Sequence, residues 1–270
     1  MKLGIGSWSF GWAVGVPGHP ALVPLDAAAL VRRAAAWGLR VVQIADNMPL
    51  HDLPGPALQA LRRLAEDSGV TIEVGTRGLL DDHVASYLEV ARALGATLLR
   101  IVVDRGEFKP APGEIAATLR RLVPLLEAAG VTLAVENHDR LTSAELAAVV
   151  RGAGSPRVGI CLDTVNSFGA MEGPELVVDT LGPLTVNLHL KDFTIRRAGH
   201  GMGFTVEGAP AGTGRLDVPW LLGRLRQLGR DPNAVIEQWV PPEATVEATV
   251  AKELDWARRS VDNLRPLIPG

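Results

Sequence analysis

Residues 158–169, with the sequence VGICLDTVNSFG, decide the fold that we expect. They form a short apolar segment that ends on a carboxylate and then breaks into a polar turn. Side chains alternate between the two faces of a strand, so Val158, Ile160 and Leu162 share one face. Cys161 and Asp163 share the other. An ionised aspartate at the inward tip of a buried strand is costly unless it is paired or holds a cation. The segment therefore predicts a buried strand that delivers Asp163 to a site.

Three further apolar segments end on a side chain that can bind a metal ion. Residues 132–136 end on Glu136, residues 186–189 on His189, and residues 234–237 on Glu237. The active sites of parallel α/β barrels form at the carboxyl ends of the strands, so we expect these side chains to meet Asp163 there.

Short apolar segments alternate with longer helical ones along the whole chain, which is the pattern of repeated strand–helix units. The expected strands cover residues 2–10, 41–46, 71–76, 98–103, 132–136, 158–163, 185–191 and 234–239. The expected helices cover residues 26–37, 57–68, 81–94, 113–129, 174–181 and 244–263, with two more that begin near 142 and 217. Glycine follows several of these helices, where it provides the left-handed conformation that ends a helix.

Eight such units predict an α/β protein with a (β/α)8 TIM barrel, in a single domain over residues 1–270. An open doubly wound sheet is the alternative, but it gathers its site at one switch point and not on four successive strands. The longest insertion, residues 192–214, is too rich in glycine for a helix. We expect it to be functional, with residues 204–207 as one arm of a small hairpin.

The composition is ordinary for a soluble globular protein, since 47% of the residues are hydrophobic and 21% are charged. The formal net charge of −3 gives no reason to expect a nucleic-acid partner. The single cysteine excludes an internal disulfide bond and fits a cytoplasmic protein. The sequence shows neither a signal peptide nor an apolar run long enough to span a bilayer, so we expect no membrane partner.

Three carboxylates and one imidazole would converge at the mouth of the barrel: Glu136, Asp163, His189 and Glu237. This oxygen-rich ligand set suits Mn²⁺, our preferred ion, with Mg²⁺, Co²⁺ or Zn²⁺ as alternatives. Four protein ligands would leave open positions for a substrate that chelates through adjacent oxygens. A simpler interpretation is that these four residues are unrelated polar strand ends, solvated at the rim of the barrel. Their positions on consecutive strands favour a single metal site instead.

Five motifs resemble those of the xylose isomerase-like TIM barrels, also called the sugar phosphate isomerase/epimerase superfamily. They lie at residues 135–138 (VENH), 162–167 (LDTVNS), 189–192 (HLKD), 212–217 (GTGRLD) and 236–237 (IE). The resemblance covers nearly the whole chain. Members of the superfamily include ketose 3-epimerases, hydroxypyruvate isomerases, inosose dehydratases, dehydroshikimate dehydratases and endonuclease IV. The resemblance implies that the four ligand candidates bind one divalent ion and that Glu136 and Glu237 also move protons.

One position departs from the ketose 3-epimerases, in which the third residue after the metal-binding aspartate is a histidine that helps to bind the substrate. Asn166 stands there in this chain and cannot titrate, which argues against a simple ketose epimerase. Residues 73–78 and 190–214 instead resemble a subgroup, the 3-oxo-isoapionate decarboxylases.

Six further residues are candidates for substrate binding: Arg77, His138, Asn166, Lys191, Arg196 and His200. Lys191 shares the strand face of His189 and should point into the mouth. Arginine pairs with carboxylates through two parallel hydrogen bonds, so Arg77 favours an anionic substrate. Outside this set, we interpret Arg100 as a structural ion-pair residue. The aromatic residues near the exit of the first strand, Trp8, Phe10 and Trp12, are candidates for the pocket wall.

The sequence thus predicts a divalent-metal-dependent isomerase or epimerase that acts on a small sugar or keto-sugar derivative through a stabilised enediolate. The main alternative is a lyase, a decarboxylase of a 3-oxo sugar acid such as 3-oxo-isoapionate. An AP endonuclease-like enzyme is less favoured, because the chain lacks a basic face for a phosphate backbone. A non-catalytic sugar-binding barrel would have no use for two glutamates beside the metal. The expected partner is a small sugar, keto-sugar or sugar acid, and a homo-oligomer is compatible with the sequence.

Overall fold

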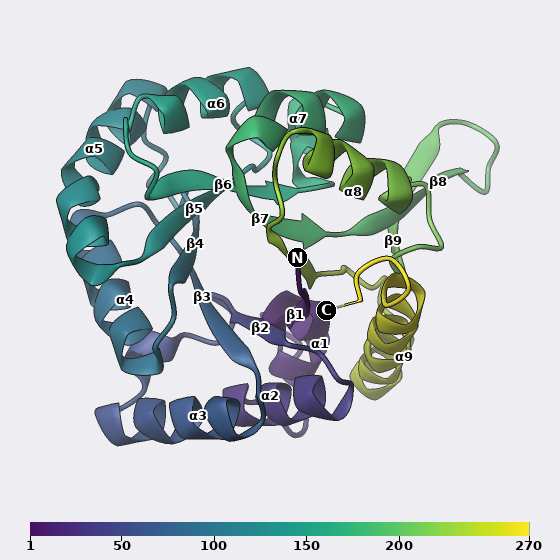
Figure 1. Cartoon of the computed structure of the whole chain (residues 1–270). Helices are drawn as coiled ribbons and strands as arrows, with labels where there is room; N and C mark the ends of the chain where they lie inside the picture. The colour runs from purple at the N-terminus through teal and green to yellow at the C-terminus, as the bar shows by residue number, and fades with distance from the viewer. Residues whose placement is uncertain (270) are drawn as a thin grey trace.

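The computed structural model describes residues 1–269, and these form the closed barrel that the sequence predicts (Figure 1). Its parallel strands are β1 (Leu3–Gly6), β2 (Val41–Ile44), β3 (Thr71–Arg77), β4 (Leu98–Val102), β5 (Thr132–Glu136), β6 (Val158–Asp163), β7 (Thr185–Leu190) and β10 (Asn233–Ile236). Strand β1 pairs with both β2 and β10, so the sheet has no free edge. The open doubly wound alternative is therefore excluded.

Helices surround the barrel on its outer side (Figure 1). They are α1 (Gly11–Val14), α2 (Ala27–Ala36), α3 (Gly55–Asp67), α4 (Asp81–Leu94), α5 (Pro112–Ala129), α6 (Ser143–Arg151), α7 (Pro174–Leu181), α8 (Val218–Gln227) and α9 (Val246–Leu264). Local sequence explains several of the boundaries. Thr142 caps α6 together with Glu145, and Gly95 and Gly130 end α4 and α5 with φ angles of 69° and 67°. Within residues 1–269, no helix combines the length and the apolar character needed to cross a membrane.

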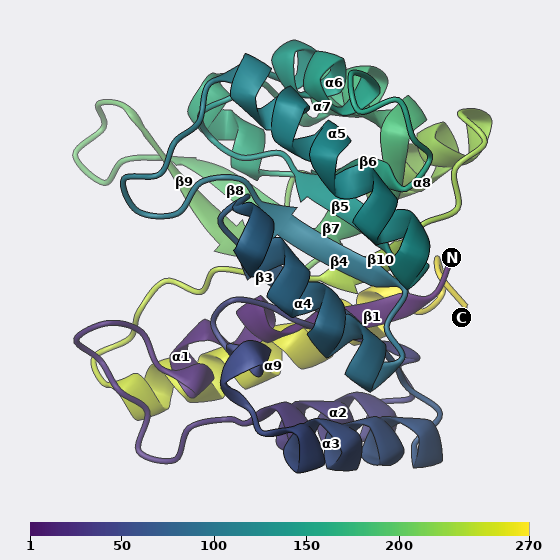
Figure 2. The same ribbon diagram turned by 90° about the vertical axis from the view of Figure 1, so that its left-hand side faces the viewer.

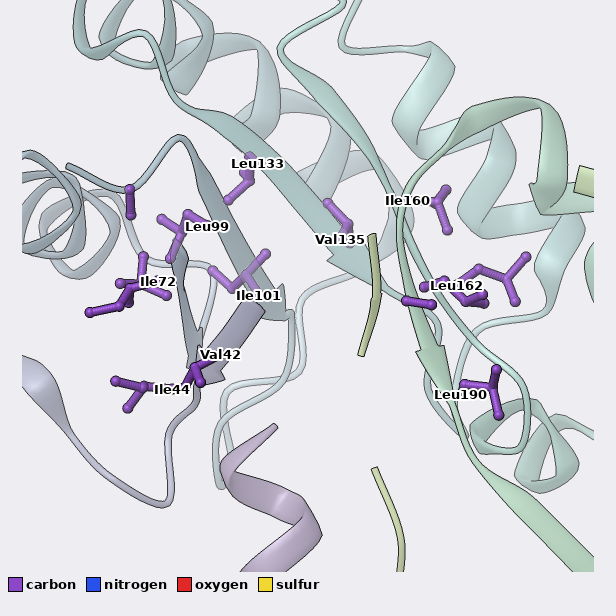
Figure 3. Packing of buried hydrophobic residues seen from close by; sticks show 14 of the residues in the cluster. Val42, Ile44, Ile72, Leu99, Ile101, Leu133, Val135, Ile160, Leu162 and Leu190 are labelled. Atoms are coloured by element: carbon purple, nitrogen blue, oxygen red, sulfur yellow. The ribbon is translucent and has the colours of Figure 1, made fainter. Parts of the chain in front are cut away.

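The side chains of the strands divide into two layers. Those that alternate outward are apolar and pack beneath the helices, as Figure 3 shows for residues of β2 to β7. Those that alternate inward include a buried polar set, with Cys161 beside it: Gln43, Glu73, Arg100, Asn187 and His189. Val158, Ile160 and Leu162 belong to the outer layer, and Asp163 points inward to the site, as the period of two predicts.

Five strands end earlier than the sequence predicts: β2, β4 and β7 by one or two residues, and β1 and β10 by four and three. Strand β1 ends at Gly6, and a short 3₁₀ helix (Ser7–Phe10) replaces its expected second half. Strand β10 ends at Ile236, three residues before the expected end. Side chains hold the two strand exits together here in place of a backbone ladder. The Ser9 hydroxyl donates to the Ile236 carbonyl at 2.7 Å, and the Gln238 amide donates to the Ser9 carbonyl at 3.0 Å.

The insertion after β7 forms an antiparallel hairpin of β8 (Asp192–Arg197) and β9 (Phe204–Ala209), which confirms the expected arm. The hairpin extends beyond the barrel on the side away from the two termini (Figure 2). Its base is tied down by the buried carboxylate of Asp192, which accepts hydrogen bonds from four backbone N–H groups, those of Phe193, Gly212, Gly214 and Leu216. A Cβ atom at Gly214 would lie 2.2 Å from Asp192 Oδ1. This close approach requires glycine in the GTGRLD motif.

Candidate functional site

The four predicted ligands come together in one buried cluster at the carboxyl ends of β5, β6, β7 and β10. One donor atom from each of Glu136, Asp163, His189 and Glu237 can be chosen so that all four lie within 4.8 Å of one another. His189 Nδ1 is at the centre, 3.5 Å from Glu136 Oε1, 3.8 Å from Asp163 Oδ2 and 3.4 Å from Glu237 Oε2. The structure thus brings the four candidates together, with Glu237 one residue past the end of its strand.

Glu136 is held by two fixed partners. Arg100 Nε contacts its Oε2, and the Asn166 amide donates to its Oε1 at 2.7 Å. Burial alone would raise the pKa of the Glu136 carboxyl, but the guanidinium of Arg100 and the ring of His189 hold that pKa well below its usual value. Arg100 is itself buried and also contacts Asp46 Oδ1 at 3.0 Å, which confirms its interpretation as an ion-pair residue.

Asp163 is fixed by the motifs on either side of it. Its Oδ1 accepts hydrogen bonds from the backbone N–H groups of Val165 and Asn166, both at 2.9 Å. Asn137, from the VENH motif, accepts from the Asp163 N–H at 2.7 Å and donates to its carbonyl at 2.9 Å. Burial would raise the pKa of Asp163, but the ammonium of Lys191, 2.7 Å from Oδ2, lowers it. The two motifs thus join the ends of β5 and β6.

Glu237 is held less firmly than Glu136. Lys191 Nζ lies 3.0 Å from Glu237 Oε2 as an ion pair, but neither oxygen of Glu237 has a hydrogen-bond partner among residues 1–269. Burial would lower the pKa of Lys191, but the carboxylates of Asp163 and Glu237 raise it. Gly6 borders Glu237 closely, since a Cβ atom at that position would lie 3.1 Å from Oε1.

These residues fit a divalent metal ion. His189 Nδ1 is buried, faces three carboxylates and has no hydrogen-bond partner in the described part of the chain. Burial would lower the pKa of His189, but the acidic groups of Cys161, Glu237 and Glu136 raise it well above its usual value. The surroundings thus favour a positive charge at this point, and three carboxylate oxygens with one imidazole nitrogen are suitable ligands for such a cation. The choice of Mn²⁺ stays a prediction.

A cavity of about 370 Å³ opens onto the cluster. Its lining residues are Trp8, Arg77, Arg100, Glu136, His138, Val165, Asn166, Lys191, Glu237, Gln238 and Trp239. Four of the six predicted substrate-binding residues therefore lie at the site. Arg196 and His200 are exposed on the hairpin and do not line this cavity. Their contact with a substrate stays a prediction.

Of the three aromatic residues proposed for the wall, Trp8 lines the cavity. Phe10 is buried in the core, where its ring lies 6.3 Å from that of Trp37, and Trp12 donates to the Val240 carbonyl. Neither of these two lines the cavity, because the 3₁₀ helix and α1 that follow β1 rotate successive side chains by about a third of a turn or less, whereas a strand rotates them by half a turn. A larger, mostly apolar cleft of about 550 Å³ lies between α2 and α3, and none of the ligand candidates lines it.

The sequence reasoning missed Asp46, which follows β2. Its carboxylate contacts Arg100 at 3.0 Å, lies 3.5 Å from Arg77 Nε and accepts from the Trp8 indole at 3.2 Å. The signal was available, because Asp46 ends an apolar segment in the same way as Asp163 does. It was overlooked because no neighbouring strand end on that side of the barrel carries a second metal-binding side chain.

Comparison with known proteins agrees with this geometry. The family described as xylose isomerase-like TIM barrel matches residues 31–260. A 3-oxo-isoapionate decarboxylase of Pectobacterium atrosepticum is 36% identical over 266 residues, which cover 98% of this chain and 95% of the relative. A 2-epi-5-epi-valiolone 7-phosphate 2-epimerase of Actinoplanes is 30% identical over 90% of this chain and 93% of its own length.

Among solved structures, a D-psicose 3-epimerase crystallised in the presence of D-fructose superposes with a TM-score of 0.74 at 17% identity, over 100% of both chains. The chain belongs to the xylose isomerase-like TIM barrel family. It is an enzyme of that family, with a buried Glu/Asp/His/Glu cluster consistent with a divalent metal site.

Proposed function

We propose that the protein is a metal-dependent decarboxylase of a 3-oxo sugar acid, with 3-oxo-isoapionate as the first substrate to test. The observation that carries this proposal is the 36% identity, over 98% of the chain, to an enzyme of that name. The four ligand candidates of this chain would hold the ion. This places the decarboxylase, the alternative in the sequence reasoning, ahead of the isomerase or epimerase.

The charges at the mouth support an anionic substrate. Seven charged side chains meet there: Asp46, Arg77, Arg100, Glu136, Asp163, Lys191 and Glu237. Four are carboxylates and three are cations, so a divalent ion would leave one positive charge among them. A carboxylate on the substrate would balance that positive charge. Arg77 is suited to bind it, because its guanidinium lines the cavity and its side chain is 42% exposed.

The arrangement of the two glutamates suits a reaction that needs one proton. When bound, a divalent ion would polarise the keto oxygen and stabilise the negative charge left by the departing CO₂. The bond between the carboxylate carbon and its neighbour breaks, and that neighbouring carbon then takes up one proton. Glu237, beside Lys191 and with Oε1 free of hydrogen bonds within residues 1–269, is our candidate to relay this proton from water. Glu136, fixed by Arg100 and Asn166, would serve mainly as a ligand.

An isomerase or epimerase is the second candidate. Two glutamates flank His189, and a 30% identical relative is named as a 2-epimerase. Epimerisation by two bases needs a proton removed on one face of a carbon and another delivered on the opposite face. It would therefore require Glu136 to exchange protons in spite of its contact with Arg100.

The test is a substrate panel assayed by NMR, with CO₂ release followed in parallel. Protein loaded with Mn²⁺, about one equivalent by elemental analysis, is given 3-oxo-isoapionate, other 3-oxo sugar acids, neutral ketoses and ketose phosphates. We expect CO₂ release from a 3-oxo acid and little turnover of neutral ketoses. Arg77→Ala should raise KM for the acid by about 10-fold or more, the order of magnitude of one lost charged hydrogen-bond pair.

Arg226→Ala is the matched control, because Arg226 is exposed on the outer surface of α8, and its KM should stay unchanged. Epimerisation of neutral ketoses, with no CO₂ from any oxo acid and no effect of Arg77→Ala, would reject the decarboxylase and establish the second candidate.

A further inference from the structure

A buried polar network lies inside the barrel, beneath the ligand cluster. Glu73 of β3 accepts hydrogen bonds from three side-chain amides: from Gln43 at 3.1 Å, from Asn187 at 2.9 Å and from Asn233 at 2.8 Å. Gln43 of β2 continues the network upward, since its Oε1 lies 2.7 Å from His189 Nε2. Glu73, Gln43 and His189 are each 3% exposed or less. One chain of hydrogen bonds thus joins the barrel floor to the ligand candidate.

The partners fix which way the Gln43 amide points. Its nitrogen lies 3.0 Å from Asn187 Oδ1 as well as 3.1 Å from Glu73 Oε2, so it faces two oxygens. A flipped amide would place its own oxygen against the Asn187 oxygen, which has no hydrogen to donate. The Asn187 amide is fixed in turn, because its nitrogen faces Glu73 and its oxygen accepts from Cys161 Sγ at 3.3 Å.

The direction of each hydrogen bond then determines the proton on His189. Since Gln43 turns its oxygen to the ring, Nε2 must carry the hydrogen and donate it. With Nε2 protonated, a metal ion that takes the place of the second ring proton finds the lone pair on Nδ1. That lone pair points at the three carboxylates, where a metal ion would take it.

We propose that Gln43 is a positioning residue, which with Glu73 holds His189 in the Nε2–H tautomer and aims Nδ1 at the metal site. The inference rests on the metal centre of the proposed function. Partners that bind the outer nitrogen of a metal-ligating histidine set its tautomer and orientation, and their loss weakens metal affinity by about 10- to 100-fold. Gln43 takes that role here, and Glu73 acts through it.

Gln43→Met tests this with little change in side-chain shape, because methionine has a similar length but no amide. The first measurement is the Kd for Co²⁺, by titration of its visible absorption. We expect it to rise about 10- to 100-fold. The second is a long-range ¹H–¹⁵N NMR spectrum of histidine-labelled protein, metal-free and with Zn²⁺. In the wild type it should show His189 protonated at Nε2 in both forms.

Thr185→Val is the matched control, since Thr185 is buried on the same strand as His189 and its hydroxyl donates only to the Leu181 carbonyl among the described residues. Its Kd for Co²⁺ should equal that of the wild type. Wild-type affinity in Gln43→Met, or a wild-type His189 that is protonated at Nδ1 and not at Nε2, overturns the proposal. If Gln43→Met does not fold, Glu73→Gln is measured in its place. An unchanged Kd for Co²⁺ in Glu73→Gln also overturns the proposal. If the wild type binds no Co²⁺, the metal centre itself is wrong, and the NMR spectrum of metal-free protein still decides the role of Gln43.

Discussion

At the scale of single residues, the site combines one well-anchored glutamate with one that is freer to react. Glu136 contacts Arg100 and Asn166 through different oxygens, and these contacts favour its ionised form. Glu237 has Lys191 near one oxygen, while the other has no hydrogen bond within residues 1–269. Two residues of the same type, on either side of one histidine, are thus suited to different tasks.

Glutamine substitutions should separate these tasks. Glu237→Gln removes the group proposed to deliver the proton, so turnover should fall about 100-fold or more. Glu136→Gln should weaken metal binding first, because it leaves the buried guanidinium of Arg100 without its negative partner. The measurements are bound Co²⁺ and the rate of deuterium incorporation from D₂O into the product. Deuterium incorporation at the wild-type rate in Glu237→Gln would show that this residue does not transfer the proton.

The chemically active residues could be predicted because strand ends and residue types carry the signal. Asp163 and His189 stand at the tips of apolar segments, so their convergence follows once the barrel is recognised. Gln43 and Glu73 gave no such signal. They lie inside strands, and only the register of β2, β3 and β7 brings them beneath His189. An amide in the middle of an apolar strand does not titrate, so its residue type alone does not indicate a function.

At the scale of elements, the β8–β9 hairpin depends on one carboxylate. Asp192 is 1% exposed and receives four backbone N–H groups, two of them from the glycines of the GTGRLD motif. The sequence predicted an arm of a hairpin from residues 204–207 but did not reveal this anchor. These hydrogen bonds join residues that are 20 and 22 positions apart, so the pattern of the nearby sequence does not predict them.

Asp192→Asn should therefore destabilise the protein. The new amide places N–H donors against backbone N–H groups and leaves buried donors without an acceptor, at a cost of about 3 kcal/mol. Urea unfolding followed by circular dichroism measures the change. Asp231→Asn is the control, because Asp231 is an exposed partner of the N-terminal ammonium group. Equal unfolding midpoints for Asp192→Asn and Asp231→Asn would mean that the anchor contributes nothing to stability.

The ends of two strands show why element boundaries are harder to predict than elements. The aromatic residues Trp8, Phe10 and Trp239 favour a strand, so the sequence predicts that β1 and β10 continue through them. Hydrogen bonds from Ser9 and Gln238 divert the chain there. These bonds span more than 220 positions, so their effect depends on closure of the barrel, which a window of sequence does not contain.

At the scale of the whole molecule, closure brings the two ends of the chain together. Strand β1 pairs with β10, and α1 packs against α9. Glu253 of α9 makes this junction directly. Its two carboxylate oxygens accept hydrogen bonds from the backbone N–H groups of Trp12 at 2.8 Å and Ala13 at 2.9 Å. The side chain is buried, and burial raises the pKa of Glu253 to about 7, although both hydrogen bonds oppose that rise.

This raised pKa predicts how stability depends on pH. Between its ordinary pKa of 4.5 and about 7, the folded protein holds a proton at Glu253 that the unfolded chain releases. The contribution to the free energy of unfolding is therefore complete below pH 4.5 and is lost as the pH rises through 7, by about 3 kcal/mol in all.

Glu253→Gln cannot titrate at this position. The free energy of unfolding of this variant should therefore rise relative to that of the wild type as the pH increases from 4 to 8.5. Urea unfolding across this range measures the difference, in which the ionisation of the site carboxylates cancels. Glu247→Gln, on the exposed first turn of the same helix, controls for the loss of one carboxylate. A constant difference between wild type and Glu253→Gln at every pH would show that Glu253 is ionised in the folded protein as readily as in the unfolded one.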